Sequence, residues 1–392
     1  MIETDTRHPG LHRTAHAFLE RHTLHHDPMS YLDHGYVKLF LAGWRGSTGE
    51  PLELAACWGL LVWRLDDVLD TELRDAEPTA VEVLVDRLLD VLDGEPTEPA
   101  DHPTARALAE LVQRTRAAMP EDWWTRYTAE LDAWIHAAAD KLEGYIRPRR
   151  TPTLREYLTL RPIDGGMLLA AMWTELALQC VTPDWNSLPV NSLLSCFSTI
   201  GTLTNDLAAD TANRQGDTFT AQDALARTTG LSAEQARQRV REQLTAEKAR
   251  FWFLLTAIRA DVRTCDPQDP MPLSPVTLRF ALALDQFGQA LTNWTLTSSR
   301  YRADSIAQPP VPEGPAPGWT LHQPFEPSSA KQDLRQVIAA AAELEQHGVT
   351  TAAEQLIRLA GLTMRLVHRI AEDLEQRLGR QSAAALIEEK SR

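Results

Sequence analysis

Apolar side chains recur every three to four residues along most of the chain, and this helical spacing constrains the fold more than any other feature. Almost no stretch alternates apolar and polar residues as a half-buried strand would. The sequence therefore predicts an all-α fold. The expected helices span residues 11–22, 28–43, 51–70, 79–92, 103–118, 121–146, 153–180, 187–210, 221–226, 232–262 and 275–301. Capping boxes are predicted at the start of two of them, formed by Thr153 with Glu156 and by Ser232 with Gln235.

A segment rich in proline and glycine, residues 307–329, interrupts the helical pattern and predicts an extended linker. We therefore expect residues 1–306 to form one helical domain and residues 330–392 to form a helical hairpin split at Gly348. Each hairpin helix has an apolar face, which predicts packing against the first domain or against a second copy of the chain in a homodimer.

Composition and charge exclude several functions. Acidic residues (54) outnumber Lys and Arg (39), giving a net charge of −15, so a nucleic-acid partner is not expected. The four cysteines have no CxxC spacing, which indicates neither a zinc site nor a disulfide framework. They are Cys57, Cys180, Cys196 and Cys265. The chain shows no apolar leader and no run of 18 uncharged apolar residues, so we expect a soluble, cytoplasmic protein without a membrane span.

An acidic cluster closes one of the most apolar predicted helices. Asp66 and Asp70 lie four residues apart, with Asp67 between them, so the outer two carboxylates share one helix face. Mg²⁺ prefers oxygen ligands and usually binds through one or two carboxylates together with substrate phosphates. The cluster therefore suggests a divalent metal site, with a solvated acidic helix end as the alternative.

The apolar residues upstream of this cluster suggest a binding cavity. Val62 and Trp63 lie on the same face as Asp66, and Gly59 one turn earlier is expected to leave open space beside them. The carboxylates are thus predicted at the rim of an apolar surface.

A second run of polar residues follows the apolar stretch that starts at residue 187. Asn205, Ala209 and Asn213 fall on one face of a continuous helix, and Asp206 and Asp210 lie on the neighbouring stripe. This pattern again brings oxygen ligands to the end of an apolar helix. Fraying of the helix into a polar loop is the alternative.

Two further features suit an anionic ligand. Pro162 and the glycine pair 165–166 are costly inside a helix, so a break that exposes backbone groups is expected just after Arg161. Arg300 and Tyr301 end the last predicted helix of the first domain, and an arginine offers a planar fork to phosphate oxygens.

Four features follow one another along the chain: the acidic cluster, the helix break, the second polar run and the Arg-Tyr pair. In this combination and order they resemble the class I terpene cyclases of bacteria over roughly residues 30–305. The acidic cluster is similar to the family's aspartate-rich motif, and Asn205 begins a segment similar to its second metal motif, N-D-x-x-S-x-x-x-E. The helix break is similar to the family's diphosphate-sensing triad, and the last helix ends in the family's Arg-Tyr pair. The matching residues are Asp66, Asp67, Asp70, Arg161, Asp164, Gly165, Asn205, Asp206, Arg300 and Tyr301.

The resemblance implies an all-α bundle around an apolar cavity, in which Mg²⁺ (three ions in this family) and basic residues ionise a prenyl diphosphate. It implies metal ligands among Asp66, Asp67, Asp70, Asn205, Asp206 and Asn213. It assigns the diphosphate and the ionisation step to Arg161, Asp164, Gly165, Arg300 and Tyr301. The expected cavity lining is Gly59, Val62, Trp63, Trp173, Phe197 and Trp294.

This chain departs from the family in the second motif, where Ala209 replaces serine and Asn213 replaces glutamate. Alanine cannot bind a metal and an amide oxygen is a weaker ligand than a carboxylate, so this site is expected to be weakened or rebuilt. Two other functions therefore remain open, a prenyl diphosphate synthase and a helical partner protein without catalysis. The substrate of a cyclase is open between a C15 farnesyl and a C20 geranylgeranyl or copalyl-type diphosphate.

Overall fold

Every regular element in the described part of the chain is helical, which confirms the predicted all-α fold. The computed structural model describes residues 9–209, 219–264 and 273–301. The α-helices are α1 (Pro9–Arg21), α2 (Pro28–Leu32), α3 (Tyr36–Gly43), α4 (Gly49–Asp67), α5 (Pro78–Asp93), α6 (Pro103–Ala118), α7 (Glu121–Lys141), α8 (Leu154–Asp164), α9 (Met167–Leu178), α10 (Leu188–Ala208), α11 (Ala221–Thr229), α12 (Ala233–Thr264) and α13 (Pro275–Thr297). Three short turns complete them: the π-helical turns η1 (Val68–Glu72) and η2 (Leu142–Ile146) and the 3-10 turn η3 (Ser299–Tyr301).

Some of the predicted elements lie outside the described residues. These are the linker, the C-terminal hairpin, Cys265 and the end of the second polar segment, which includes Asp210 and Asn213. Among the residues that the structure does cover, no helix is long and apolar enough to cross a membrane.

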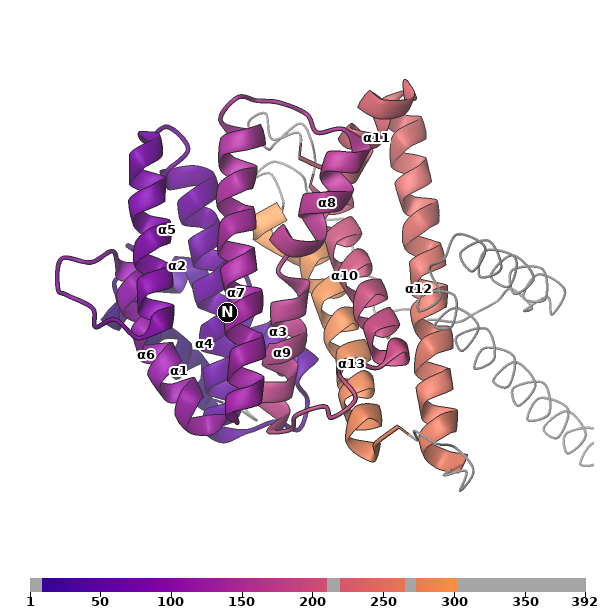
Figure 1. Ribbon diagram of the computed structural model, residues 1–392, viewed down its shortest axis with the longest axis horizontal. Helices are drawn as coiled ribbons and strands as arrows, with labels where there is room; N and C mark the ends of the chain where they lie inside the picture. Colours follow the sequence, from indigo (N-terminus) through magenta and orange to yellow (C-terminus); the bar gives the residue numbers. More distant parts are fainter. Residues whose placement is uncertain (1–8, 210–218, 265–272, 302–392) are drawn as a thin grey trace, which may run out of the picture. The chain divides into compact units, whose positions relative to one another are not determined.

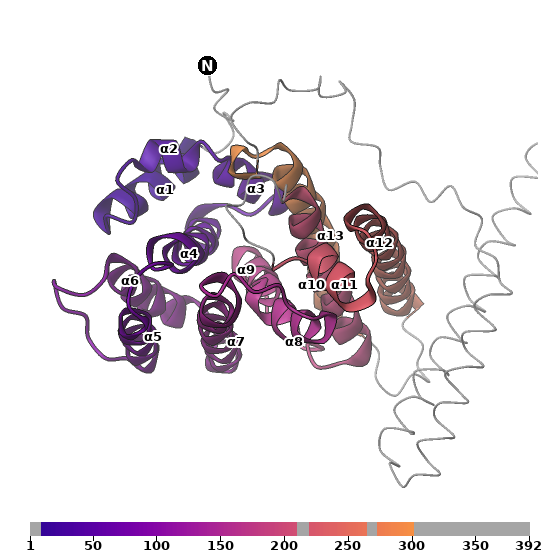
Figure 2. The same ribbon diagram turned by 90° about the horizontal axis from the view of Figure 1, so that it is seen from above.

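The helices run side by side as a bundle (Figure 1). Five of them close a ring of contacts in which α4 packs on α9, α9 on α10, α10 on α13, α13 on α3 and α3 on α4, as the view from above shows (Figure 2). Helices α6 and α1 cover the outside of α4, and α12 covers α10 and α13. Four helices of this ring, α4, α9, α10 and α13, contribute residues to the site described below.

Capping residues start several of the helices where the sequence predicted. Thr153 Oγ1 accepts a hydrogen bond from the backbone N–H of Glu156 (3.3 Å), and the Glu156 carboxylate accepts one from the N–H of Thr153 (2.7 Å). Ser232 and Gln235 make the same reciprocal pair before α12. Both predicted capping boxes are therefore confirmed.

The predicted helix 28–43 is wrong as a single element, because the chain turns between α2 and α3. Gly35 has a φ of +86°, in the left-handed region that interrupts a right-handed helix. The turn exposes the carbonyl oxygen of His34, which accepts hydrogen bonds from Trp294 Nε1 (2.7 Å) and Ser298 Oγ (2.8 Å). The break thus fastens the N-terminal helices to the end of α13.

The predicted break after Arg161 is confirmed, but the glycines rather than the proline make it. Pro162 lies inside α8, which continues to Asp164. Gly166 has a φ of +63° and precedes the first residue of α9. The corner between α8 and α9 therefore falls at residues 165–166.

Gly59 does not leave open space, contrary to the sequence-based prediction. A Cβ atom there would lie 2.8 Å from Cζ of Phe40, so the ring of Phe40 already fills the position. The glycine allows α4 and α3 to approach closely.

We expect Gly59→Ala to lower the free energy of unfolding by about 1–3 kcal/mol, because the Phe40 ring must be displaced. Gly144→Ala is the matched control, since no other described segment comes within 4 Å of its Cβ position and alanine favours a helix. Urea unfolding of both variants measures the difference. An equal stability of Gly59→Ala and the unsubstituted protein would contradict the close packing.

Candidate active site

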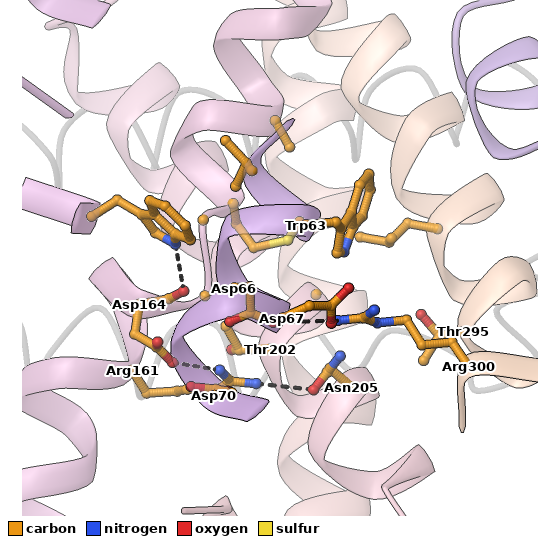
Figure 3. Close-up of a pocket in the computed structure, with 18 of the residues that line it drawn as sticks. Trp63, Asp66, Asp67, Asp70, Arg161, Asp164, Thr202, Asn205, Thr295 and Arg300 are labelled. Carbon is orange, nitrogen blue, oxygen red and sulfur yellow. Dashed lines mark hydrogen bonds and ion pairs between the residues drawn. The ribbon is translucent and has the colours of Figure 1, made fainter. Parts of the chain in front are cut away.

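A cavity of about 430 Å³, with a polar end and an aromatic end, is lined mainly by residues of α4, α7, α8, α9, α10 and α13. The polar lining consists chiefly of Asp66, Asp67, Asp70, Lys141, Arg161, Asp164, Asn205 and Arg300. The aromatic lining is Trp63, Trp134, Trp173, Phe219, Phe287, Trp294 and Tyr301. Figure 3 shows the labelled polar side chains gathered in one layer, with Trp63 on one side of it. A cavity of this size lies within the usual range for small-molecule sites.

The acidic cluster sits where α4 changes into a π-helical turn. Asp66 and Asp67 are the last residues of α4, and Asp70 lies in η1. Arg300 Nη2 lies 2.7 Å from Asp67 and 3.3 Å from Asp66, which joins this cluster to the end of the last helix (Figure 3). Tyr31 also donates a hydrogen bond to Asp67 (3.2 Å). All three carboxylates line the cavity, and each is paired with a cationic side chain of the protein.

Lys141 is a site residue that the sequence analysis missed. Its Nζ lies 2.8 Å from Asp70 Oδ2, 3.0 Å from Asp164 Oδ1 and 3.3 Å from Asp66 Oδ1. A signal was present in the sequence, because Lys141 follows Trp134 and Ala138 at the i, i+4, i+7 spacing of the buried face of α7. A lysine on such a face needs an acidic partner inside the protein.

Arg161 joins the helix break to the second polar segment. Its Nη1 donates to Asp164 Oδ2 (2.7 Å), and its Nη2 donates to Asp206 Oδ1 (2.7 Å) and Asn205 Oδ1 (3.1 Å), as Figure 3 shows for Asp164 and Asn205. The Nδ2 of Asn205 in turn donates to the hydroxyl of Tyr301 (2.9 Å). One guanidinium therefore connects α8, α10 and, through Asn205, η3.

Asp206 does not face the cavity, contrary to its predicted role as a metal ligand. Its side chain is 0% exposed. Besides Arg161, its carboxylate accepts hydrogen bonds from the Tyr157 hydroxyl (2.7 Å) and the backbone N–H of Ala221 (2.8 Å). The residue fixes Arg161 and the start of α11 instead of offering oxygens to a ligand.

The predicted common face of Asn205, Ala209 and Asn213 is also wrong in part. Helix α10 ends at Ala208, and Ala209 is buried in an extended backbone conformation. Asn205 lines the cavity, while Asn213 lies outside the described residues. Only Asn205 of the three is therefore placed at the site.

Most of the predicted apolar lining reaches the cavity. Val62, Trp63, Trp173 and Trp294 line it, together with the helix-break residue Gly165. Gly59 and Phe197 are not among the lining residues; Phe197 is buried beside Phe287, with ring centroids 6.4 Å apart. Trp134, Phe219 and Phe287 line the cavity although the sequence analysis did not single them out.

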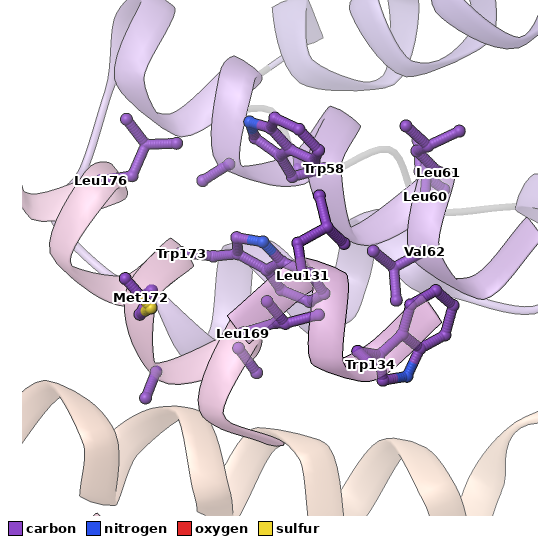
Figure 4. Close-up of a cluster of buried hydrophobic side chains, with 14 of the residues drawn as sticks. Trp58, Leu60, Leu61, Val62, Leu131, Trp134, Leu169, Met172, Trp173 and Leu176 are labelled. Atoms are coloured by element: carbon purple, nitrogen blue, oxygen red, sulfur yellow. The ribbon is translucent and has the colours of Figure 1, made fainter. Parts of the chain in front are cut away.

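Trp134 and Trp173 of the wall also belong to a larger buried cluster, and Figure 4 shows the part of it that α4, α7 and α9 contribute. The indole N–H groups are satisfied: Trp173 donates to the hydroxyl of Tyr127 (2.9 Å) and Trp134 donates to the carbonyl oxygen of Asp164 (2.9 Å). These hydrogen bonds fix the orientation of the rings. The Trp134 bond also ties the cavity wall to the corner between α8 and α9.

Trp63 is in contact with several aromatic rings at once. Its ring centroid lies 5.2 Å from that of Tyr36, 5.3 Å from that of Trp294 and 6.3 Å from that of Trp173. These centroid distances are typical of aromatic pairs, which stabilise a protein beyond the area that they bury. Tyr36, Trp63, Trp173 and Trp294 therefore form one connected set of rings.

The charges at the polar end perturb the acidity of its groups. Burial alone would raise the pKa of Asp66, but Lys141 and Arg300 outweigh it and hold that pKa below its usual value. Burial, with the nearby Asp66 and Asp164, raises the pKa of Asp70 to about 7 despite Lys141. Burial would lower the pKa of Lys141, but Asp164, Asp70 and Asp66 raise it well above its usual value, so Lys141 remains charged.

The donor set fits a hard divalent cation. Asp66 and Asp70 offer carboxylate oxygens, Asn205 offers an amide oxygen, and Asp70 Oδ1 is buried without a hydrogen-bond partner among the described residues. Within the same part of the chain, no three His, Cys, Asp or Glu side chains form a preformed metal cage. A Mg²⁺ ion here would depend on oxygens from its ligand to complete its coordination, as is usual for this ion.

The raised pKa of Asp70 predicts a pH-dependent difference in stability between the protein and Asp70→Asn. Below pH 7, Asp70 in the folded protein holds a proton that the unfolded chain has already released, which stabilises the fold. This stabilisation is lost as the pH rises through about 7. In metal-free buffer, Asp70→Asn should therefore gain stability relative to the unsubstituted protein between pH 5 and pH 8, as measured by urea unfolding. A difference that does not vary with pH would contradict this assignment.

Comparison with known proteins agrees with the geometry. The family model described as terpene synthase family 2, C-terminal metal binding, matches residues 57–250. (+)-T-muurolol synthase of Roseiflexus castenholzii is 25% identical over 256 residues, covering 64% of this chain and 76% of the relative. Pristinol synthase of Streptomyces pristinaespiralis is 24% identical over 269 residues, covering 67% of this chain and 71% of the relative.

Solved structures share the fold. Linalool/nerolidol synthase from Streptomyces clavuligerus, in complex with 2-fluorogeranyl diphosphate, superimposes with a TM-score of 0.62 at 20% identity, covering 73% of this chain and 99% of that one. 2-Methylisoborneol synthase from Streptomyces coelicolor, in complex with Mg²⁺ and 2-fluoroneryl diphosphate, gives a TM-score of 0.64 at 14% identity, covering 76% and 94%.

A helical bundle with an apolar cavity and an acidic and basic mouth defines an isoprenoid synthase fold, and the structural neighbours share it. The fold alone does not identify the enzyme, but the match to the family model and the two relatives indicate a terpene synthase. The chain belongs to the bacterial class I terpene synthase family. It is a terpene synthase, an enzyme of the lyase class.

Proposed function

We propose that this enzyme uses Mg²⁺ to ionise a prenyl diphosphate, cyclises the resulting carbocation to a terpene and releases pyrophosphate. The observation that carries the proposal is the two-ended cavity, in which carboxylates and guanidinium groups adjoin a wall of aromatic rings. The polar end suits a diphosphate with its metal ions, and the aromatic end suits a hydrocarbon chain.

In this proposal Asp66 and Asp70 hold metal on one side of the cavity, and Asn205 holds it on the other. Three ions are proposed on the resemblance to the family. Bound Mg²⁺ would supply positive charge that stabilises the departing pyrophosphate. The support from this chain is the convergence of oxygen donors, together with Asp70 Oδ1, which has no hydrogen-bond partner in the part of the chain that the structure describes. Asp67 is proposed to hold Arg300 in place, since it is already paired with that residue.

We propose that Arg161, Arg300 and Tyr301 bind the oxygen atoms of the diphosphate. Both guanidinium groups line the cavity, and each is fixed by carboxylates, Asp164 and Asp206 for Arg161 and Asp67 for Arg300. Donors held in this way need little rearrangement when negative charge develops on the leaving group. Gly165, at the corner beside Arg161, lets α8 pack closely on α10, since a Cβ atom there would collide with Thr202.

The aromatic wall has two proposed roles. Trp63, Trp173 and Trp294 exclude water, which would otherwise quench the carbocation early. Their faces also stabilise positive charge, at about 0.5–2 kcal/mol for each well-placed ring.

We propose a C15 farnesyl diphosphate as the substrate. The support is the printed activity of the relative from Roseiflexus castenholzii, which cyclises (2E,6E)-farnesyl diphosphate. C20 substrates, acyclic or of the copalyl type, are the alternative that the following experiment tests.

The test is incubation of the full chain with Mg²⁺ and C10, C15, C20 or copalyl-type diphosphates, followed by pyrophosphate assay and gas chromatography–mass spectrometry. We expect a cyclic product and pyrophosphate from the C15 substrate, and neither after chelation of the metal. A product that forms only when isopentenyl diphosphate is added would indicate a prenyl diphosphate synthase. Folded protein that releases pyrophosphate from none of the substrates would refute catalysis.

A further inference from the structure

Lys141 occupies the position between the carboxylates to which we assign a metal ion. The three acidic groups around its Nζ come from different elements: Asp66 from α4, Asp70 from η1 and Asp164 from α8. All three lie within 3.3 Å of the ammonium nitrogen. The lysine side chain is only 7% exposed.

This arrangement has a clear electrostatic effect in the absence of metal. Asp66 and Asp70 are like charges one helical turn apart, and Asp164 adds a third carboxylate. Repulsion among them would favour moving them apart, whereas a single ammonium group holds them together. Lys141 therefore keeps the carboxylates close to the geometry that a metal ion would require.

A metal ion and the ammonium group cannot share this position. Mg²⁺ requires oxygen ligands at about 2.0–2.1 Å. The Nζ atom lies between Asp66 Oδ1 and Asp70 Oδ2, at 3.3 Å and 2.8 Å, which is the space that a bridging ion would fill. The ion must displace the ammonium from at least these two carboxylates.

We propose that Lys141 is a resident counter-cation of the aspartate-rich motif, which makes metal binding depend on the diphosphate. Without diphosphate, an arriving ion must break the ion pairs of Lys141 and is repelled by its charge. With diphosphate present, the displaced ammonium remains at the cavity wall, paired with Asp164, and can donate to diphosphate oxygens. The inference rests on the proposed function, because it takes Asp66 and Asp70 as metal ligands.

The proposal predicts a coupling between two ligands, and such coupling is reciprocal. Metal should bind weakly to the protein alone and more tightly in the presence of pyrophosphate. Removing the ammonium group should lower the free-energy cost of binding metal in the absence of pyrophosphate. We expect Lys141→Gln to bind metal without pyrophosphate about tenfold more tightly or better, since a unit charge close to a divalent ion in a partly buried site has a large unfavourable interaction with it.

The experiment titrates the full-length protein with Mn²⁺, followed by electron paramagnetic resonance, in the absence and presence of inorganic pyrophosphate. Three variants are compared. Lys141→Gln removes the charge, Lys141→Arg keeps a cation at the site, and Lys38→Gln removes an exposed lysine on α3 as the matched control for net charge. A metal-free thermal melt of each variant reports whether it is folded.

Two results together would support the proposal. In the absence of pyrophosphate, Lys141→Gln should bind Mn²⁺ more tightly than the unsubstituted protein, and pyrophosphate should increase the Mn²⁺ affinity of this variant less. Lys141→Arg should remain a weak binder in the absence of pyrophosphate. Equal Mn²⁺ affinities of Lys141→Gln and the unsubstituted protein, or the same tightening in Lys38→Gln, would overturn it. If Lys141→Gln fails to fold, tight Mn²⁺ binding by the unsubstituted protein without pyrophosphate would overturn it as well. The product assay described above is independent of these titrations, so the proposed function can stand when this inference fails.

Discussion

Asp66→Asn is expected to lower the rate of pyrophosphate release by about 1,000-fold or more with the preferred substrate, because the asparagine loses a negative charge at the proposed metal site. Metal ions contribute several kcal/mol to the stabilisation of a phosphate leaving group, and each 1.4 kcal/mol is about a factor of ten in rate. The position also contacts Lys141 and Arg300, so the substitution removes a partner from both cations. The measurement is steady-state pyrophosphate release at saturating Mg²⁺, with circular dichroism as a check on folding.

Asp86→Asn is the matched control for this change. Asp86 lies on an exposed part of α5, outside the cavity, and the substitution removes the same charge from the molecule. We expect its activity to equal that of the unsubstituted enzyme. A folded Asp66→Asn variant with normal turnover would refute the metal assignment.

Arg161→Met is expected to reduce both stability and catalysis. The guanidinium is 11% exposed and pairs with Asp164 and Asp206, both of which have fully buried side chains. Leaving buried carboxylates without their cation typically costs about 3–5 kcal/mol, so the urea midpoint should fall markedly. Turnover should fall by about 100-fold or more, because a proposed donor to the diphosphate is lost.

Two variants separate these effects. Tyr157→Phe removes only one hydrogen bond to Asp206 and leaves the guanidinium in place, so it should lower stability by about 1 kcal/mol with little loss of turnover. Arg161→Lys keeps the charge but not the planar fork, and it should fold better than Arg161→Met while remaining impaired in turnover. Normal pyrophosphate release by Arg161→Met would show that Arg161 is a structural residue only.

The helical fold was predictable because it depends on local periodicity and caps. Helix α6 begins and ends at the predicted residues, and the capping box at Thr153 lies where the sequence indicated. The division between α2 and α3 was missed: it falls at Gly35, and the Trp294 side chain that bonds to the turn is distant in the sequence. The open space expected at Gly59 failed for the same reason, since Phe40 comes from another helix.

Site residues divide in a similar way. Asp66, Asp70, Arg161, Asn205 and Arg300 could be selected from motifs and all reach the cavity. Asp206 belongs to the same motif as Asn205, yet its buried carboxylate accepts hydrogen bonds from Tyr157 and Ala221 and does not face the cavity. Lys141 belongs to none of the motifs: helical spacing indicates that it is buried, but only the structure shows the three carboxylates from other segments around it.

The connected rings around Trp63 have a consequence for changing the product. Because Trp63 touches Tyr36, Trp173 and Trp294, a smaller side chain at any one of these positions gives its neighbours room to reorient. The contour presented to the substrate is then a joint property of the set, and effects of single substitutions should not add when they are combined. Libraries that vary these positions together will therefore reach cavity shapes that stepwise selection of the best single substitutions would miss.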